Sequence, residues 1–412
     1  MSIIAPKTPP NGSVDPAPPV TPISRGRAAF VLVSVVLVTA LLGGSMLGAA
    51  AKSDSGDGSL YKYLSVFTEV LSLVRQSYVD ATGMDGLMAG AMDGTTDALD
   101  PFSVYVPQDQ VAAFAEAKRV GASRSGLFVL KERGMPYAVT VAPDSPAAKA
   151  GLETGDLLAK LQGRSTRLMP LWEIWQILAG APGSKLDIET IRRGEAKELS
   201  FQLADAPSAP PQVVDRDGVA MLRLGAIDAG AAAQVEAALR APLAQERHKL
   251  LLDLRGSASS DPAPAYAVAA LFAKGDLGAL LGKEADVSTF RGDQEPVWKG
   301  EIVVLQDRGT LGAAEVLATV LRQRTGAKLV GERTFGYAGR QTEVGLSNGA
   351  VVQLTDAFYA GPDRERLRDG LKPDVLIDER SRSFNEQDKP LGDLILERGL
   401  RLLAPEPAKK AA

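Results

Sequence analysis

The most constraining feature of this sequence is a stretch of 24 residues without a charged side chain, residues 28–51. About 20 apolar residues suffice for a helix to cross the hydrocarbon core of a membrane. Arg25 and Arg27 precede the stretch, and positive charge on one flank keeps that flank in the cytoplasm. We therefore predict a disordered, proline-rich cytoplasmic tail (1–27), a transmembrane signal anchor (28–51) and an exported remainder.

A cleaved secretory signal peptide is the alternative, because the small residues Ala49, Ala50 and Ala51 would suit cleavage. The uncharged stretch is longer than the apolar core of a typical signal peptide, which favours the anchor. The predicted localisation is the inner (cytoplasmic) membrane, crossed once, with the bulk of the chain on its outer side.

Composition excludes several kinds of site. The chain has no cysteine and one histidine, His248, which rules out disulfide frameworks, Cys–His nucleophile pairs and zinc fingers. His248 stands among charged residues, and we expect it at the surface. The net charge of −4 argues against nucleic-acid binding, which needs a basic surface. We predict no metal, no cofactor and no nucleic-acid partner.

Residues 58–120 are predicted to be a helical N-terminal segment. Apolar residues recur at helical spacing from Leu60 to Tyr78, which indicates an amphipathic helix. Its apolar face either packs in a core or forms a dimer beside the membrane. A second helix is expected over residues 85–99, and Pro101 ends it.

Residues 121–204 are predicted to be a β-rich domain, because short apolar runs are separated by Gly, Pro and Asp turns. A helix is expected over residues 171–178, and prolines at 207, 210 and 211 mark a linker after the domain. The expected strands are residues 127–130, 137–141, 157–161 and 186–191.

Residues 213–380 alternate between strand and helix patterns, which indicates an α/β core with a mostly parallel sheet. Residues 381–412 are predicted to be a C-terminal helix and tail. The fold class is therefore α+β and multi-domain. In the core, strands are expected over residues 219–224, 250–254 and 302–305, and helices over residues 229–239, 265–272 and 313–324.

The β-rich domain resembles a PDZ domain. Residues 145–152 read Ser-Pro-Ala-Ala-Lys-Ala-Gly-Leu, and Gly-Asp follows at 155–156, which is similar to the signature of bacterial PDZ domains. Such domains add an extended peptide to a sheet edge and hold its terminal carboxylate on backbone N–H groups. The resemblance implies a peptide-binding site formed by Gly126, Leu127, Phe128 and Trp175.

Four further motifs, in order along the chain, resemble the carboxyl-terminal processing proteases, also called tail-specific proteases. The resemblance spans residues 60–377. It implies serine endopeptidases with a Ser–Lys dyad, often membrane-anchored and periplasmic, that grip a substrate's C-terminus with a PDZ domain and cut it with an α/β core. The motifs are Leu-Asp-Pro-Phe-Ser (99–103), Leu-Asp-Leu-Arg (252–255), Val-Gly-Glu-Arg-Thr-Phe-Gly (330–336) and Gly-Leu-Lys-Pro-Asp-Val (370–375).

The chain departs from this family at both reacting positions. The family's nucleophilic serine lies three residues before a glutamate that opens a helix, and here that position is Gly312. The family's lysine follows the Gly-Glu-x-Thr-Phe-Gly block, and here it is Tyr337. A glutamine that orients the lysine is present as Gln341. The family's Asn-Pro-Gly-Gly loop, which faces the oxyanion, is replaced by Gly-Ser-Ala-Ser-Ser-Asp over residues 256–261.

A relocated nucleophile is the alternative. Thr310 lies two residues before Gly312 and carries a hydroxyl, whereas Lys328 precedes a buried strand and should point elsewhere. An ordinary polar loop is expected for Ser257, Ser259 and Ser260.

These observations predict a membrane-anchored, periplasmic pseudoprotease. It would bind protein or peptide C-termini through the PDZ domain and act as a scaffold or regulator, alone or in a homo- or hetero-oligomer with an active protease. Two alternatives stay open: an active serine-type endopeptidase with a non-standard catalytic centre, and a structural envelope protein whose PDZ fold serves only for packing.

Overall fold

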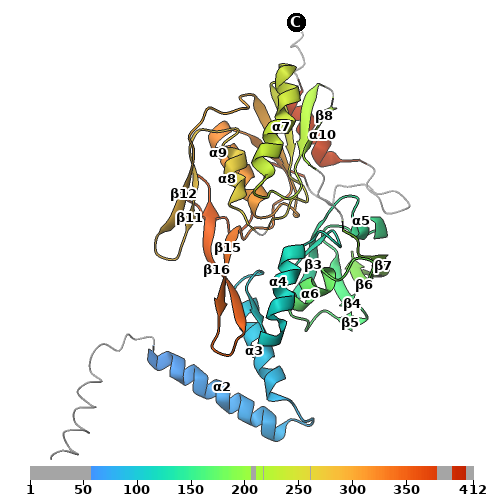
Figure 1. The fold of residues 1–412 in the computed structure, drawn as a ribbon, viewed down its shortest axis with the longest axis vertical. Helices are drawn as coiled ribbons and strands as arrows, with labels where there is room; N and C mark the ends of the chain where they lie inside the picture. Colours follow the sequence, from blue (N-terminus) through green and yellow to red (C-terminus); the bar gives the residue numbers. More distant parts are fainter. Residues whose placement is uncertain (1–56, 206–209, 217, 260, 378–391, 405–412) are drawn as a thin grey trace, which may run out of the picture. The chain divides into compact units, whose positions relative to one another are not determined.

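A computed structural model of the chain describes residues 57–205, 210–216, 218–259, 261–377 and 392–404 (Figure 1). They fall into two units, one ending at Gly83 and the other beginning at Met84. The predicted cytoplasmic tail (1–27) and membrane anchor (28–51) lie outside the described residues. Within the described residues, no helix is both long enough and apolar enough to span a bilayer.

The first unit contributes helix α2 (Asp57–Ser77), as the helical spacing predicts. The side chains of Leu60, Tyr63 and Val70 are each more than half exposed. On the same face Phe67, Leu71 and Val74 are half-buried. Among the described residues, none of α2 belongs to a buried apolar cluster.

The second unit opens with two helices on either side of a short strand. Helix α3 (Met84–Asp97) matches the predicted second helix and is followed by β1 (Val104–Val106), a 3-10 turn and α4 (Val111–Val120). The Asp100 carboxylate accepts hydrogen bonds from two backbone N–H groups ahead of it, each at 2.8 Å. This Asx turn connects α3 to β1.

The predicted β-rich domain is a single antiparallel sheet with two helices. Its strands are β2 (Leu127–Glu132), β3 (Met135–Val141), β4 (Leu157–Leu161), β5 (Arg164–Ser165), β6 (Lys185–Arg192) and β7 (Glu195–Gln202), and its helices are α5 (Pro146–Ala150) and α6 (Leu171–Leu178). The order is β2-β3-β4-β6-β7, with β5 beside β4. All four predicted strands are confirmed; β7 was missed because most of its side chains are polar or charged.

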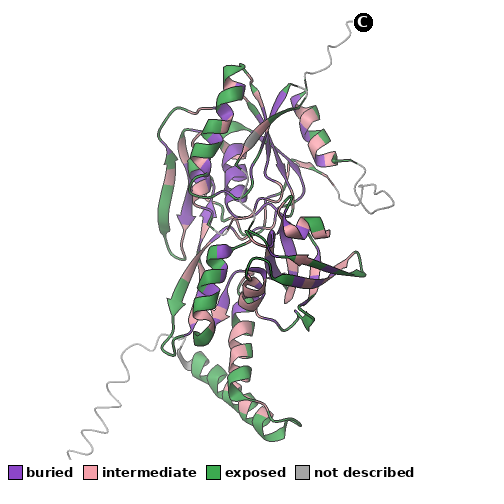
Figure 2. Cartoon of the chain, turned by 45° about the vertical axis from the view of Figure 1, so that its right-hand side comes forward, coloured by how far each residue is buried: buried purple, intermediate pink, exposed green. Residues whose placement is uncertain are grey.

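The predicted α/β core is a largely parallel sheet with helices on both faces, and its central strands are almost entirely buried (Figures 1 and 2). In its central strand, Leu250 and Leu252 pack on one face, whereas Leu251 packs with Ile395 on the other. The strands are β8 (Gln212–Arg216), β9 (Val219–Arg223), β10 (Lys249–Asp253), β13 (Glu301–Gln306), β14 (Lys328–Gly331) and β17 (Val375–Leu376). The helices are α7 (Ala231–Ala244), α8 (Pro264–Ala269), α9 (Ala313–Thr325) and α10 (Leu394–Leu403).

The sheet order is β17-β14-β13-β10-β9-β8, and only β8 runs antiparallel to its neighbour. The predicted strands and helices of this core are confirmed. Helix α10 also confirms the C-terminal helix expected within residues 381–412.

A second antiparallel sheet was not predicted. It contains β11 (Gly275–Leu281), β12 (Asp286–Gly292), β15 (Gly339–Gly345) and β16 (Val351–Ala360). The order is β1-β16-β11-β12, and β15 also pairs with β16. Strands β12 and β15 are polar and largely exposed, so they hold no apolar run that would indicate a strand.

A buried apolar cluster joins the β-rich domain to the core. It includes Leu130 and Val139 of the β-rich domain and Leu311 of the core, which precedes α9. The Thr140 hydroxyl also donates to the Gly309 carbonyl oxygen at 3.0 Å. The turn before α9 therefore lies against β3.

Leu130→Ala should lower the free energy of unfolding by about 2–5 kcal/mol, because a buried leucine leaves a cavity when it is truncated. Leu130 is 1% exposed, whereas Leu168, the control position, is 89% exposed. Urea unfolding followed by tryptophan fluorescence compares Leu130→Ala with Leu168→Ala. Equal unfolding midpoints would contradict the packing described for this cluster.

Candidate functional site

The candidate catalytic centre is the turn between β13 and α9. The turn ends at Gly312, the N-cap residue of α9, with φ 64° and ψ −111°. Glu315, in the first turn of the helix, accepts a hydrogen bond from the Gly312 N–H at 3.0 Å. Enzymes can hold a nucleophile on such a strand-to-helix turn, where it faces the substrate. The residue at this position is thus placed for catalysis but carries no hydroxyl.

The space beside Gly312 is filled by the chain itself. A Cβ atom at Gly312 would collide with the carbonyl oxygen of Ser259, and the left-handed φ disfavours any residue but glycine. The loop that carries Ser259 runs along the turn: the Leu311 N–H donates to the Ser257 carbonyl oxygen at 2.9 Å, and Ala258 pairs with Leu311 in a parallel bridge. A serine at position 312 would require this loop to move.

Thr310, the candidate replacement nucleophile, is fully buried. Its hydroxyl donates to the Leu254 carbonyl oxygen at 2.9 Å and accepts from the Asp307 N–H at 3.0 Å. Ser257 is buried too, and its hydroxyl donates to the Gly225 carbonyl oxygen at 2.5 Å. Neither hydroxyl is accessible to a substrate in this geometry.

The positions that correspond to the family's lysine and glutamine line different cavities. Tyr337, with φ 61°, lines a cavity of about 700 Å³. Gln341 lines a second cavity of about 540 Å³. The Gln341 amide donates to the Thr355 hydroxyl at 2.9 Å. The glutamine is therefore engaged with its own hairpin and not with the side chain at position 337.

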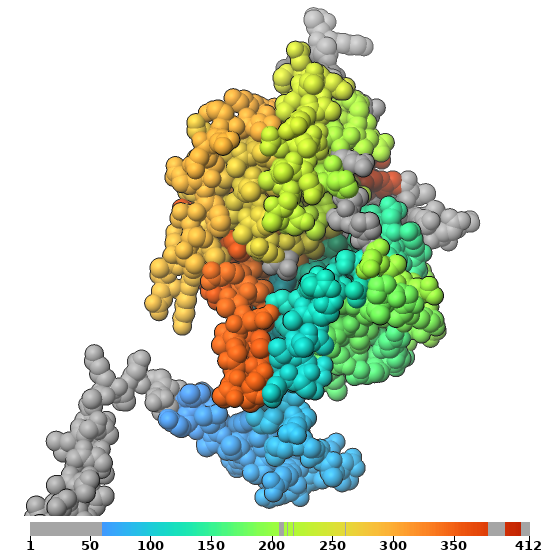
Figure 3. Space-filling view, in the orientation of Figure 1, coloured from blue at the N-terminus to red at the C-terminus, as the bar shows by residue number. Residues whose placement is uncertain are grey.

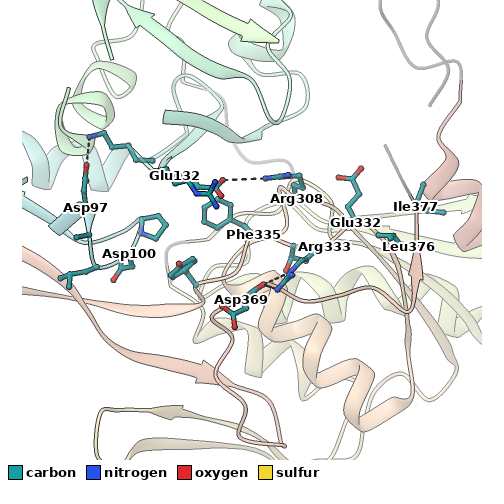
Figure 4. A pocket seen from close by; sticks show the side chains of 17 residues that line it. Asp97, Asp100, Glu132, Arg308, Glu332, Arg333, Phe335, Asp369, Leu376 and Ile377 are labelled. Atoms are coloured by element: carbon teal, nitrogen blue, oxygen red, sulfur yellow. Dashed lines mark hydrogen bonds and ion pairs between the residues drawn. The ribbon is translucent and has the colours of Figure 1, made fainter. Parts of the chain in front are cut away.

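The larger cavity is lined by side chains of both charges (Figure 4). Glu132 and Arg308 approach each other to 4.0 Å across it, and Arg333 donates to the Asp369 carbonyl oxygen. Because acidic and basic groups alternate around the wall, the cavity has no single sign of charge that would select a charged ligand.

The predicted carboxylate-binding loop is engaged within the chain. The Gly126 N–H donates to the Ala122 carbonyl oxygen at 2.7 Å, and the Leu127 N–H donates to the Ser125 hydroxyl at 3.1 Å. A Cβ atom at Gly126 would collide with the Ser145 side chain, so the packing of this domain itself requires a glycine here. Two of the N–H groups predicted to bind a peptide carboxylate thus have partners already.

Trp175 covers part of the outer edge of β2. Its indole Nε1 donates to the Val129 carbonyl oxygen at 2.8 Å, and its ring stacks on Phe114 with centroids 6.1 Å apart. Because β2 is the edge strand of its sheet, this carbonyl is one that an added peptide strand would use.

The cavity of about 540 Å³ lies between the β-rich domain and the core. On the surface, the segment containing α4 lies against the β15–β16 hairpin (teal and orange in Figure 3), and Lys118 pairs with Glu343 at 2.6 Å. The β-rich domain lines the cavity with Leu127, Phe128 and Trp175. Three of the four residues predicted to bind a peptide thus meet here, together with Lys118, Asp261, Arg340, Gln341, Gln353 and Tyr359.

The polar groups of this cavity are mostly neutral or paired. Arg340 pairs with Asp356 at 2.6 Å. Burial and the nearby Asp261 carboxylate raise the pKa of Tyr359 to about 12, so its phenol stays protonated and is no general base near neutral pH. The cavity can bind an apolar group and orient it with hydrogen bonds, but it holds no activated nucleophile.

A buried carboxylate joins the catalytic turn to the loop before Tyr337. Glu315 accepts hydrogen bonds from the Gly336 N–H at 2.7 Å and from the Thr334 hydroxyl, in addition to the Gly312 N–H. Burial raises the pKa of Glu315 to about 7, although these three hydrogen bonds oppose the shift.

Other residues that the sequence singled out have structural roles. Arg255 pairs with Asp253 at 2.8 Å and with Asp393, the N-cap residue of α10, at 2.7 Å. His248 and Lys328 are exposed, as expected. In the part of the chain that the structure describes, no group of three or more Cys, His, Asp or Glu residues could hold a metal ion.

Three residues of the cavity of about 540 Å³ were not predicted from any sequence pattern. Lys118, Arg340 and Tyr359 come from α4, β15 and β16. They meet because β16 pairs with β1, β11 and β15. None of these strands was predicted, so only the pairing of distant strands could have placed the three side chains together.

Stability should fall as pH rises from 4.5 to about 7, because the folded chain keeps a proton on Glu315 that the unfolded chain releases. A shift of this size corresponds to about 3 kcal/mol. Glu315→Gln should remove most of that slope. Urea unfolding of both chains between pH 5 and pH 8 measures it, and an unchanged slope in the variant would contradict the assignment.

Comparison with known proteins agrees with the motifs. The chain matches the model of peptidase family S41 over residues 218–377. It is 27% identical to the carboxy-terminal processing protease CtpA of Bacillus subtilis (strain 168), over 84% of this chain and 76% of that protein. It is 25% identical to the carboxy-terminal-processing protease of Bartonella bacilliformis, over 86% of this chain and 83% of that protein.

Among solved structures, the chain is similar to the photosystem II D1 C-terminal processing protease, with a TM-score of 0.64 and 24% identity over 76% of this chain and 88% of that one. This likeness concerns the fold. The predicted resemblance is thereby confirmed: residues 218–377 are a peptidase family S41 domain, and the relatives to which the chain is similar are carboxy-terminal processing proteases.

Proposed function

We propose that this chain is a membrane-anchored pseudoprotease, which binds protein C-termini without cutting them. The observation that carries the proposal is the turn before α9, where Gly312 replaces the nucleophile and the Ser259 carbonyl oxygen fills the space that a side chain would need. Tyr337 replaces the base. Removing a nucleophile and its base typically lowers an enzyme's rate by several powers of ten.

Two backbone N–H groups of the turn are engaged within the chain. An oxyanion needs N–H groups aimed at the point where charge develops. Here the Leu311 N–H donates to Ser257 and the Gly312 N–H donates to Glu315. The N–H groups of Leu311 and Gly312 are therefore occupied by the chain's own acceptors.

We propose that the β-rich domain is a PDZ domain and that the C-terminal end of its bound peptide enters the 540 Å³ cavity. A cavity of this size, apolar with a few polar groups, is typical of ligand sites. Phe128 and Trp175 suit an apolar terminal side chain. Arg340 uses only two of its N–H groups on Asp356, which leaves others for a terminal carboxylate. Because the Gly126 and Leu127 N–H groups are engaged, Arg340 is the better carboxylate donor.

Peptide addition along β2 requires Trp175 to release the Val129 carbonyl oxygen. The indole N–H would then need another acceptor or water, and the hydrogen bond given up has a net worth of about 1 kcal/mol. A peptide strand that donates its own N–H to Val129 replaces that bond.

The proposed anchor is residues 28–51, which would hold the remainder of the chain at the periplasmic face of the inner membrane. There the chain would act as a scaffold or regulator that presents captured C-termini to an active relative, in a mixed oligomer or by transfer. The proposal is tested against two alternative functions. One is an active endopeptidase that uses Thr310 as its nucleophile, and the other is a purely structural envelope protein.

The test mixes the purified full chain, in detergent micelles, with fluorescent peptides that end in apolar residues. Peptides with an amidated C-terminus are the matched ligands, because they lack the carboxylate. We expect binding of the free-carboxylate peptides and no cleavage product by mass spectrometry. Phe128→Ala should weaken binding about tenfold, which corresponds to about 1.4 kcal/mol, whereas Leu168→Ala should leave it unchanged.

Two results would overturn the proposal. Cleavage by the native chain that is lost in Thr310→Ala would establish a relocated catalytic centre. Absence of both binding and cleavage, with a folded β-rich domain, would assign the chain a structural role instead.

A further inference from the structure

The cavity of about 540 Å³ contains a carboxylate that forms no ion pair with any described residue. Asp261 lies on the cavity wall and is exposed. One of its carboxylate oxygens, Oδ1, accepts a hydrogen bond from the Ala263 N–H at 3.0 Å, just before α8. A carboxylate can accept about four hydrogen bonds. Asp261 therefore has acceptor positions left for a group that enters the cavity.

The two cations that line the same cavity are paired with other carboxylates. Lys118 pairs with Glu343 at 2.6 Å, and Arg340 pairs with Asp356 at 2.6 Å. Each of these positive charges is thus offset by a neighbour, whereas the negative charge of Asp261 is not offset by any described residue. A charge without a partner in a concave site attracts a ligand group of the opposite sign.

Aromatic residues line the cavity as well, among them Phe128, Trp175 and Tyr359. The faces of aromatic rings attract cations, and Trp does so most strongly. The chain uses this attraction beside the cavity, where the Lys118 Nζ atom lies over the Phe114 ring, 5.6 Å from its centroid. A carboxylate together with aromatic rings is suited to bind an ammonium or guanidinium group.

We propose that this cavity selects peptides with a lysine or arginine next to their terminal residue, and that Asp261 binds that basic side chain. The inference rests on the proposed function, because it concerns the ligand of the same site. It adds a specificity-determining residue, which lies in the loop where the chain departs from the Asn-Pro-Gly-Gly motif of the proteases it resembles.

The position of Tyr359 relates Asp261 to the proposed carboxylate donor. Burial raises the pKa of the Tyr359 phenol most, the Asp261 carboxylate adds to the shift and the Arg340 guanidinium opposes it. Both charged groups therefore lie within electrostatic reach of one phenol. A peptide whose terminal carboxylate binds Arg340 then needs only a long side chain on the preceding residue to reach Asp261, and lysine supplies a flexible four-carbon stem.

Successive side chains of an extended peptide point in opposite directions. The terminal apolar side chain can therefore lie against Phe128 and Trp175 while the preceding side chain points elsewhere in the cavity. A glutamate at that preceding position would face Asp261 and be repelled. Norleucine, which has the stem of lysine without its ammonium group, would keep the apolar contacts and lose the ion pair.

The test compares three fluorescent peptides that differ only in the next-to-last residue, which is lysine, norleucine or glutamate. Fluorescence polarisation measures their affinity for the full chain in detergent micelles. We expect the lysine peptide to bind about tenfold more tightly than the norleucine peptide, from one ion pair and one cation–aromatic contact. The glutamate peptide should bind most weakly. Added salt should reduce the preference for lysine, because ions screen exposed charges.

Asp261→Asn keeps an oxygen for the Ala263 N–H and removes the charge. In this variant the lysine and norleucine peptides should bind with affinities within about twofold of each other, because the ion pair is gone while other contacts remain. Asp293→Asn is the matched control, since Asp293 is exposed and does not line the cavity. It should keep the native preference, and thermal unfolding checks that both variants are folded.

The outcomes separate this inference from the proposed function. Equal binding of the lysine and norleucine peptides by the native chain, or a preference that survives in Asp261→Asn, would overturn the role of Asp261 and leave peptide capture standing. Failure of every peptide to bind the folded native chain would overturn both.

Discussion

The catalytic turn and the loop that precedes Tyr337 depend on one buried carboxylate. Glu315 accepts hydrogen bonds from the N–H groups of Gly312 and Gly336 and from the Thr334 hydroxyl. A carboxylate out of contact with water is costly unless its partners stay in place. Glu315 thus ties the turn that ends at Gly312 to the loop before Tyr337.

The backbone around Gly312 leaves little room for a side chain at that position. The loop of Ser257–Ser259 pairs with Leu311, and its carbonyl oxygen occupies the space that a serine side chain would need. The Gly309 carbonyl oxygen on the same turn accepts a hydrogen bond from Thr140 of the β-rich domain. The turn that ends at Gly312 and the β-rich domain are thus parts of one packed unit, and the cavity of about 540 Å³ lies between the β-rich domain and the core.

Most helices and buried strands, and the family, could be predicted because each is indicated by a short stretch of sequence. The apolar run before Asp253, the helix spacing of residues 171–178 and the motif around Glu332 each lie within a short window. Strands β12 and β15 of the antiparallel sheet were missed because they are polar and largely exposed. The position of Lys118 and Arg340 on one cavity was missed too. Two further contacts join segments that are distant in the sequence, so no local pattern predicts them. The Ser259 carbonyl oxygen lies where a Cβ atom of residue 312 would be, and the Trp175 indole N–H donates to the Val129 carbonyl oxygen.

The most direct measurement restores the two missing groups. Gly312→Ser and Tyr337→Lys are combined in one chain, and its unfolding midpoint and its cleavage of unfolded protein are measured beside those of the native chain. We predict a lower midpoint and no cleavage product, because the Ser259 carbonyl oxygen leaves no room for the serine. A variant that is as stable as the native chain and cleaves protein would show that the nucleophile's place is open, and would contradict the central claim.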